Sequence, residues 1–70
     1  MSGRELEGMV EEELPRGLYA VRGDDGRRLV ASLPIRSRHA IVKLLRGDRV
    51  KLEVSSADTS RARIIGRVDG

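Results

Sequence analysis

The sequence contains no cysteine, tryptophan or phenylalanine, and only one tyrosine and one histidine. Without cysteine, disulfides and thiolate metal sites are both excluded, and a small domain built without such bonds is typical of the reducing cytoplasm, where we expect this protein. One histidine cannot form a zinc site by itself, and no cofactor is predicted. No apolar run approaches the roughly 20 residues that span a bilayer, and the acidic start does not resemble a signal peptide. We therefore expect no membrane partner.

The chain has 70 residues, which predicts a single domain over 1–70 with an ordered body at about 5–68. Its net charge of +3 is unevenly distributed. Residues 1–14 hold five glutamates against one arginine, a net −4, so the remainder carries +7. Basic charge concentrated in one part of a small domain is typical of proteins that bind polyanions such as nucleic acid.

Apolar and polar residues alternate with a period of two in five segments, which predicts five strands. The segments are 5–14 (ELEGMVEEEL), 18–23 (LYAVRG), 27–33 (RRLVASL), 48–56 (DRVKLEVSS) and 61–68 (RARIIGRV). Turn-forming residues separate them at 15–17, 23–26 and 57–60. In the first segment, simple alternation places Glu12 on the side of Val10 and opposite Glu11 and Glu13, and Gly8 indicates a bulge or tight bend.

The spacing changes to i, i+3, i+4 at Ile41, Leu44 and Leu45, which predicts one short helix between Ser37 and Leu45 whose apolar residues pack on the barrel. Gly47 stands where such a helix ends. This apolar face is too short, and too poor in aromatic residues, to lie in a membrane interface. The basic residues around it have no glutamate four positions away to pair with; they are Arg36, Arg38, Lys43 and Arg46.

Three strands, a short helix and two further strands are the order of elements in the OB-fold. We predict an all-β protein: a five-stranded OB-fold barrel with one short helix between strands 3 and 4. An SH3-like barrel is the second possibility, disfavoured by a helix this late in the chain.

Enzyme motifs are absent: there is no phosphate-binding glycine-rich loop, nucleophile elbow or His-Glu-x-x-His sequence. The consecutive Glu11, Glu12 and Glu13 do not suggest acid–base catalysis, because successive strand residues point to opposite faces. His39 lies in a basic run, where exposure or a phosphate contact is expected. We predict a binding protein and not an enzyme.

Tyr19 is the only aromatic residue, and it either packs within its strand or stacks on a base. Proteins that hold single strands on an OB surface use several aromatic side chains for stacking. Their shortage favours a structured RNA, recognised through its backbone and shape. Alternation also predicts that Arg61, Arg63 and Arg67 line one face of the last strand, forming a second basic cluster beside that of the helix.

Nearly the whole chain, from about Leu6 to Arg67, resembles bacterial translation initiation factor one without gaps. The segments that carry the resemblance are EGMV, LPRGLYAV, DDG, VASL, LLRGDRVKLEV and DTSRARI. The resemblance implies a monomeric factor that binds the small ribosomal subunit at the aminoacyl site. It would contact ribosomal RNA and a neighbouring ribosomal protein, and act with the other initiation factors to place initiator tRNA.

The resemblance and the charge pattern together predict RNA contacts at Arg16, Gly17, Arg36, Arg38, His39, Lys43, Arg46, Arg61, Arg63 and Arg67, with Tyr19 as a possible stacking residue. The chain departs from the family pattern on this predicted face, at 34–38, at Ala40-Ile41, at Arg61-Ala62 and at Ser32. Two alternatives stay open: a general structured-RNA-binding or RNA-chaperone OB protein, and a protein-interaction module that docks through its acidic first strand or its basic helix.

Overall fold

The computed structural model describes residues 4–34 and 44–68, which form five strands and one short 3₁₀ turn. The elements are β1 (Glu5–Leu14), η1 (Pro15–Gly17), β2 (Leu18–Gly23), β3 (Arg28–Ser32), β4 (Arg49–Val54) and β5 (Arg61–Arg67). All five predicted strands are confirmed, each within three residues of its expected bounds. Within the described ranges, no helix is long and apolar enough to cross a membrane.

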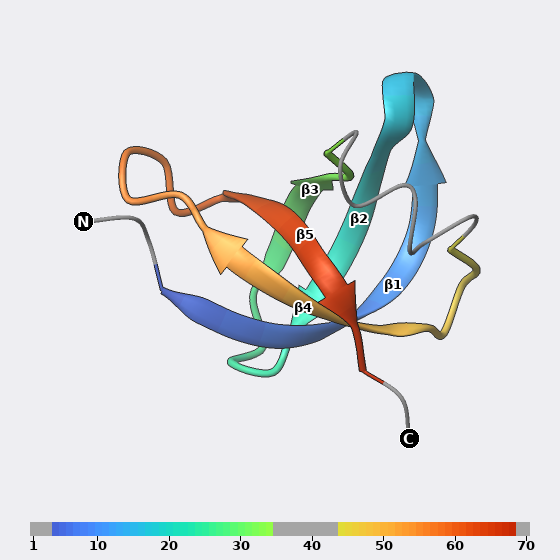
Figure 1. The fold of residues 1–70 in the computed structure, drawn as a ribbon, viewed down its shortest axis with the longest axis horizontal. Helices are drawn as coiled ribbons and strands as arrows, with labels where there is room; N and C mark the ends of the chain where they lie inside the picture. The colour runs from blue at the N-terminus through green and yellow to red at the C-terminus, as the bar shows by residue number, and fades with distance from the viewer. Residues whose placement is uncertain (1–3, 35–43, 69–70) are drawn as a thin grey trace.

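The strands close into a barrel in the order β1-β2-β3-β5-β4. All neighbours are antiparallel except β3 and β5, which run parallel from the Val30–Arg61 pair. The long β1 curves under the barrel and pairs with β4 through its first half and with β2 through most of its length (Figure 1). This arrangement confirms the predicted OB-fold class.

The core lies inside the barrel and receives side chains from every strand. The largest fully buried side chains are Leu29, Leu52, Ile64, Val10, Val21 and Val50. Each sits at an apolar position of the period-two pattern, because alternate residues of a strand point to the same face. No polar or charged side chain is buried in the described ranges. Burial of aliphatic side chains is therefore the main stabilising term.

The predicted helix falls mainly on 35–43, outside the described residues, and only its expected last turn can be compared. Leu44 is buried as predicted. Leu45 was expected to pack on the barrel, but this is wrong: it is 59% exposed and not helical. The carboxylate of Asp48 accepts a hydrogen bond from the Leu45 backbone N–H at 2.8 Å, and the chain turns there before β4. Successive residues of a non-helical segment thus take opposite sides.

A β-bulge lies in β1, but at Glu11 and not at Gly8 as predicted. Val10 is opposite Val21 and Glu12 is opposite Ala20, which leaves Glu11 as the extra residue. Because a bulge shifts the alternation by one, Glu12 lies on the outer side together with Glu11. Gly8 instead allows a close approach: a Cβ atom there would be 2.7 Å from the Arg22 carbonyl oxygen.

A second bulge lies in β5, where Lys51 is opposite Gly66 and Leu52 is opposite Ile64, so that Ile65 is extra. Beyond it, Arg67 is in register with Val50, which is fully buried. Residues directly opposite each other share a face of the sheet. Arg67 therefore leaves the row that begins with Arg61 and Arg63, and the prediction that all three line one face is correct only for the first two.

Candidate nucleic-acid interface

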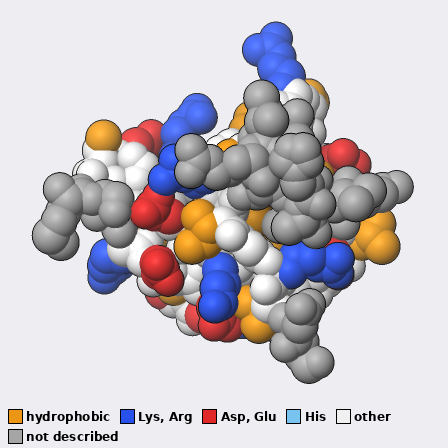
Figure 2. Space-filling view, viewed as in Figure 1, with side chains coloured by type: hydrophobic (Ala, Val, Ile, Leu, Met, Phe, Trp, Pro, Cys, Tyr) orange, Lys and Arg blue, Asp and Glu red, His pale blue; other side chains and the backbone are white. Residues whose placement is uncertain are grey.

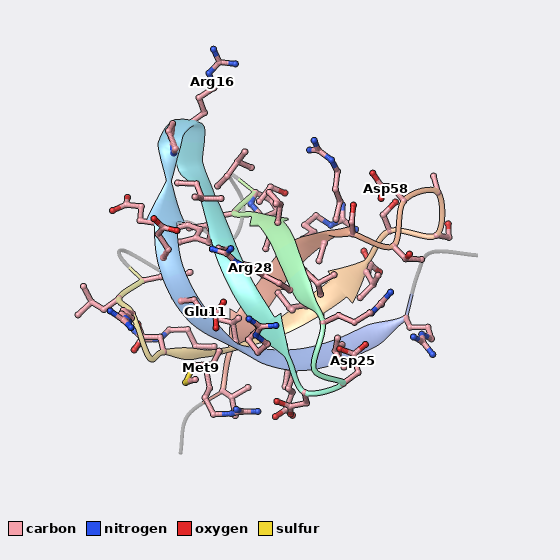
Figure 3. The ribbon with its side chains drawn as sticks, turned by 180° about the vertical axis from the view of Figure 1, so that it is seen from behind. Met9, Glu11, Arg16, Asp25, Arg28 and Asp58 are labelled. Atoms are coloured by element: carbon pink, nitrogen blue, oxygen red, sulfur yellow. The ribbon has the colours of Figure 1, made fainter. Side chains whose placement is uncertain are left out.

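The tip of the β1–β2 hairpin presents Arg16, which points away from the barrel (Figure 3). Its backbone has φ 66° and ψ 31°, and Gly17 follows with φ 73°. Left-handed backbone in a non-glycine residue costs about 1–2 kcal/mol. Within the described ranges Arg16 forms no ion pair. The turn therefore holds an unneutralised guanidinium at the most prominent point of the hairpin.

Arg61 and Arg63 lie two residues apart on the outer side of β5 and are both exposed. Arg61 faces the carboxylate of Asp58 at 3.7 Å, and Arg63 is ion-paired with Glu53 of β4. With Ser55 and Ser56 they line a shallow cavity of about 370 Å³ where β4 leads into the β4–β5 loop. Two guanidinium groups beside serine hydroxyls are suited to the phosphate groups of a nucleic-acid backbone.

The loop beside this cavity is held by hydrogen bonds from its own side chains. Ser55 Oγ accepts hydrogen bonds from the backbone N–H groups of Ala57 and Asp58, each at 3.2 Å. The Asp58 carboxylate accepts from Ser60 Oγ at 2.6 Å and from the Ser60 backbone N–H at 3.0 Å. These bonds, foremost that from the Ser60 hydroxyl, lower the pKa of Asp58. Asp58 is therefore committed to the loop as well as to Arg61.

The other predicted contacts lie apart from this cavity. Arg67 sits at the far end of β5 and faces Asp48 at 3.6 Å. Arg46 is exposed in the turn before β4 and forms no ion pair within the described part of the chain. Predicted contacts at Arg36, Arg38, His39 and Lys43 lie outside the described residues. Figure 2 shows lysine and arginine side chains at several separate places on one face.

The outer side of β1, β2 and β3 also carries two arginines, but both are paired with glutamates. Glu11 lies 3.3 Å from Arg22 and 3.4 Å from Arg28, and Glu12 lies 3.3 Å from Arg28. Figure 3 shows Glu11 and Arg28 on this side of the barrel. The sequence argument that these carboxylates cannot converge is wrong for Glu11 and Glu12, since the bulge turns both outward. They converge on guanidinium groups and form a salt-bridge network.

A second such network joins β4 to the β2–β3 turn. Arg49 donates to the Asp24 carboxylate at 2.8 Å and lies 3.6 Å from Glu7. The hydrogen bond to Asp24 raises the pKa of Arg49. In the same turn, Asp25 accepts hydrogen bonds from the backbone N–H and guanidinium of Arg27, and the backbone bond lowers the pKa of Asp25. Arg27 and Arg49 therefore serve the barrel end first.

Tyr19 does not offer its ring to a base. It is only 6% exposed and belongs to the core cluster, so the packing alternative is the one the structure supports. Since Tyr19 is the only aromatic residue of the chain, stacking on a ring is unavailable. The described ranges contain no cluster of histidines and carboxylates that could hold a metal ion. What they offer is guanidinium groups and hydroxyls.

Sequence reasoning missed the carboxylates that accompany the arginines, above all Glu53. Glu53 is directly opposite Arg63 in the β4–β5 register, but this pairing depends on the alignment of two strands. The only available signal was that 53 and 63 are both at outward positions of strands joined by one turn. Such a pattern indicates neighbours only when the register is known.

Comparison with known proteins gives consistent matches, although no family model matches the chain. Chloroplastic translation initiation factor IF-1 of Ceratophyllum demersum is 42% identical, and that of Calycanthus floridus var. glaucus 44%, each over 62 residues that cover 89% of this chain and 80% of the relative. The solution structure of the translation initiation factor of the same name from the wolbachia endosymbiont of Brugia malayi matches with a TM-score of 0.73 and 29% identity, covering 96% of this chain and 79% of the other. YjeQ from Thermotoga maritima matches in fold, with a TM-score of 0.72 at 21% identity, over 94% of this chain and 23% of the other.

Proposed function

Because the chain belongs to the translation initiation factor IF-1 family, we propose that it is a translation initiation factor that binds the small ribosomal subunit. The observation that carries the proposal is the 62-residue match to relatives of that name, which spans most of both chains. In finer detail, the proposal is that it binds at the aminoacyl site through ribosomal RNA and a neighbouring ribosomal protein. There it assists the placement of initiator tRNA together with the other initiation factors, as a monomer and without catalysis.

The geometry supports contact with RNA phosphates at two described places. One is the hairpin tip, where Arg16 has no ion-pair partner among the described residues and Gly17 lets the turn protrude. The other is the cavity of Arg61 and Arg63. Both offer guanidinium groups without an aromatic ring, which suits recognition of RNA through its backbone and shape. Arg46, Arg67 and the predicted contacts within 35–43 complete the proposed interface.

The proposed location is the cytoplasm, where bacterial-type ribosomes work; the plant relatives carry the name chloroplastic. No observation favours a general RNA chaperone over this proposal, and the burial of Tyr19 removes the stacking residue such a role would use. Docking of a partner protein through the acidic strand is disfavoured too, because Glu11 and Glu12 are already paired.

The test is binding of the purified chain to isolated small ribosomal subunits at near-physiological salt, with an excess of unrelated structured RNA as competitor. We expect saturable binding of one chain per subunit that survives the competitor. Binding that the competitor abolishes would overturn the specific assignment and leave a general RNA-binding protein. Competition with initiation-complex assembly, followed by the rate of initiator tRNA binding, tests the finer claim.

A further inference from the structure

The ion pair between Arg63 and Glu53 places a carboxylate where the proposed phosphate contact would form. Glu53 and Arg63 are opposite each other in the β4–β5 register, and their side chains are in direct contact. The Arg63 side chain is 56% exposed, whereas that of Glu53 is only 21% exposed. A phosphate can therefore reach the guanidinium from solvent, but it must compete with a carboxylate that the protein holds in place.

The neighbours of this pair make Glu53 the dominant anion at Arg63. On the other side of β5, the residue in register with Arg63 is Ser32 of β3, which is uncharged. Asp58, the other carboxylate of the loop, is bound by Ser60 and faces Arg61. The two arginines of the cavity thus differ, since Arg61 faces its partner at 3.7 Å and Arg63 is in close contact with its own.

A like charge next to Glu53 strengthens its need for a cation. Glu5 of β1 is directly opposite Glu53 in the β1–β4 register, on the same outward face. Like charges directly opposite across two strands are destabilising. The row Glu5, Glu53, Arg63 therefore runs across three strands with the cation at one end. When Arg63 turns to a phosphate, Glu53 loses this partner while still facing Glu5.

We propose that Glu53 is an intramolecular competitor of RNA phosphate for Arg63, and that it limits the affinity of the β4–β5 cavity for RNA backbone. The carboxylate occupies the guanidinium in the free protein and is displaced when a phosphodiester binds. This rests on the proposed function in one respect, the use of Arg63 as a phosphate contact. Its consequence is that loosely fitting RNA is rejected, since only a backbone that also engages other contacts compensates for the displaced pair.

The test measures binding of a short RNA hairpin by fluorescence anisotropy across a series of salt concentrations. Glu53→Gln should bind roughly two- to fivefold more tightly than the wild type, the factor that corresponds to one exposed ion pair. Two controls remove the same charge elsewhere: Glu5→Gln lies in the same row without touching Arg63, and Glu12→Gln belongs to the network on the other side. Both should change affinity by less than the Glu53 variant.

A double-mutant cycle isolates the pair. In an Arg63→Gln background, Glu53→Gln should have no effect on hairpin binding. Glu53→Asp provides a second variant at constant net charge, because its shorter side chain no longer reaches Arg63, and it should also tighten binding. Thermal unfolding of each variant checks that the barrel remains folded.

Equal gains from Glu5→Gln and Glu53→Gln, or a gain that persists without Arg63, would overturn the inference, as would failure of every variant to bind the hairpin. The ribosome experiment is separate. If the chain fails to bind small subunits while the cycle on the hairpin holds, the proposed function is wrong and the competitor role of Glu53 stands; the reverse result rejects only the competitor role.

Discussion

The β1–β2–β3 side and the β4–β5 side of the barrel each carry two exposed arginines on their outer faces, yet the two pairs differ in what surrounds them. Arg22 and Arg28 share Glu11 and Glu12 in one connected network, and Arg22 also donates to the Gly26 carbonyl at 3.1 Å. Arg61 and Arg63 have one carboxylate each and border a cavity. The number of arginines on a surface is thus a poor guide to the positive charge available to a ligand.

The largest expected effect separates these two sides by RNA affinity. Arg61→Gln with Arg63→Gln should weaken binding to a structured RNA at least tenfold and reduce the slope of log affinity against log salt by about 1.4–1.8, since each lost phosphate contact removes roughly 0.7–0.9. Arg22→Gln with Arg28→Gln changes the net charge equally and should weaken binding no more than about twofold, since screening limits distant charges. Equal losses from both double variants would mean that only net charge matters.

The next effect concerns packing, which also differs between the two sides. Gly8→Ala should lower the free energy of unfolding by about 1–3 kcal/mol, because the added Cβ would lie 2.7 Å from the Arg22 carbonyl oxygen and 2.8 Å from a Val21 methyl group. Gly66→Ala in β5 is the matched control, since nothing lies within 4 Å of its Cβ position. Urea denaturation of both variants measures the difference, and a Gly66→Ala loss as large as that of Gly8→Ala would contradict it.

The hairpin tip, which belongs to neither paired set, allows strain and charge to be separated. Arg16→Gly relieves the left-handed strain of about 1–2 kcal/mol but gives the unfolded chain about 0.4–1 kcal/mol of extra entropy, so the net gain in stability should be up to about 1 kcal/mol. Binding to small subunits should weaken. Arg16→Ala should weaken binding equally without the gain in stability. If binding were unchanged in both, the tip would not contact RNA.

The smallest effect is a pH dependence of the loop beside the cavity. The Ser60 hydrogen bonds lower the pKa of Asp58, so their stabilising contribution is present above the ordinary aspartate pKa near 3.8 and is lost as the pH falls through the lowered value. NMR titration should show the Asp58 carboxylate protonating below that ordinary value in the wild type. In Ser60→Ala the midpoint should rise toward it. An unchanged midpoint would show that Ser60 does not set the pKa.

Much of the fold was predictable because the alternation of apolar and polar residues records which side of a strand is buried. The five strands, the turn at 23–26 and the core positions Val50, Leu52 and Val54 follow from this pattern. The basic residues of the candidate interface were identifiable from their type and from the resemblance. Their partners were not, because an ion pair between strands depends on register, and register depends on how the whole barrel closes.

The sequence by itself determined the strand segments, the aliphatic core, the absence of aromatic stacking beyond Tyr19 and the family to which the chain belongs. Only the tertiary structure decided the bulges at Glu11 and Ile65, the departure of Arg67 from the row of Arg61 and Arg63, and the exposure of Leu45. The physical reason is that closing a sheet into a barrel requires local shifts of register and twist. Alternation within one strand carries no information about those shifts, which are set by the neighbouring strands.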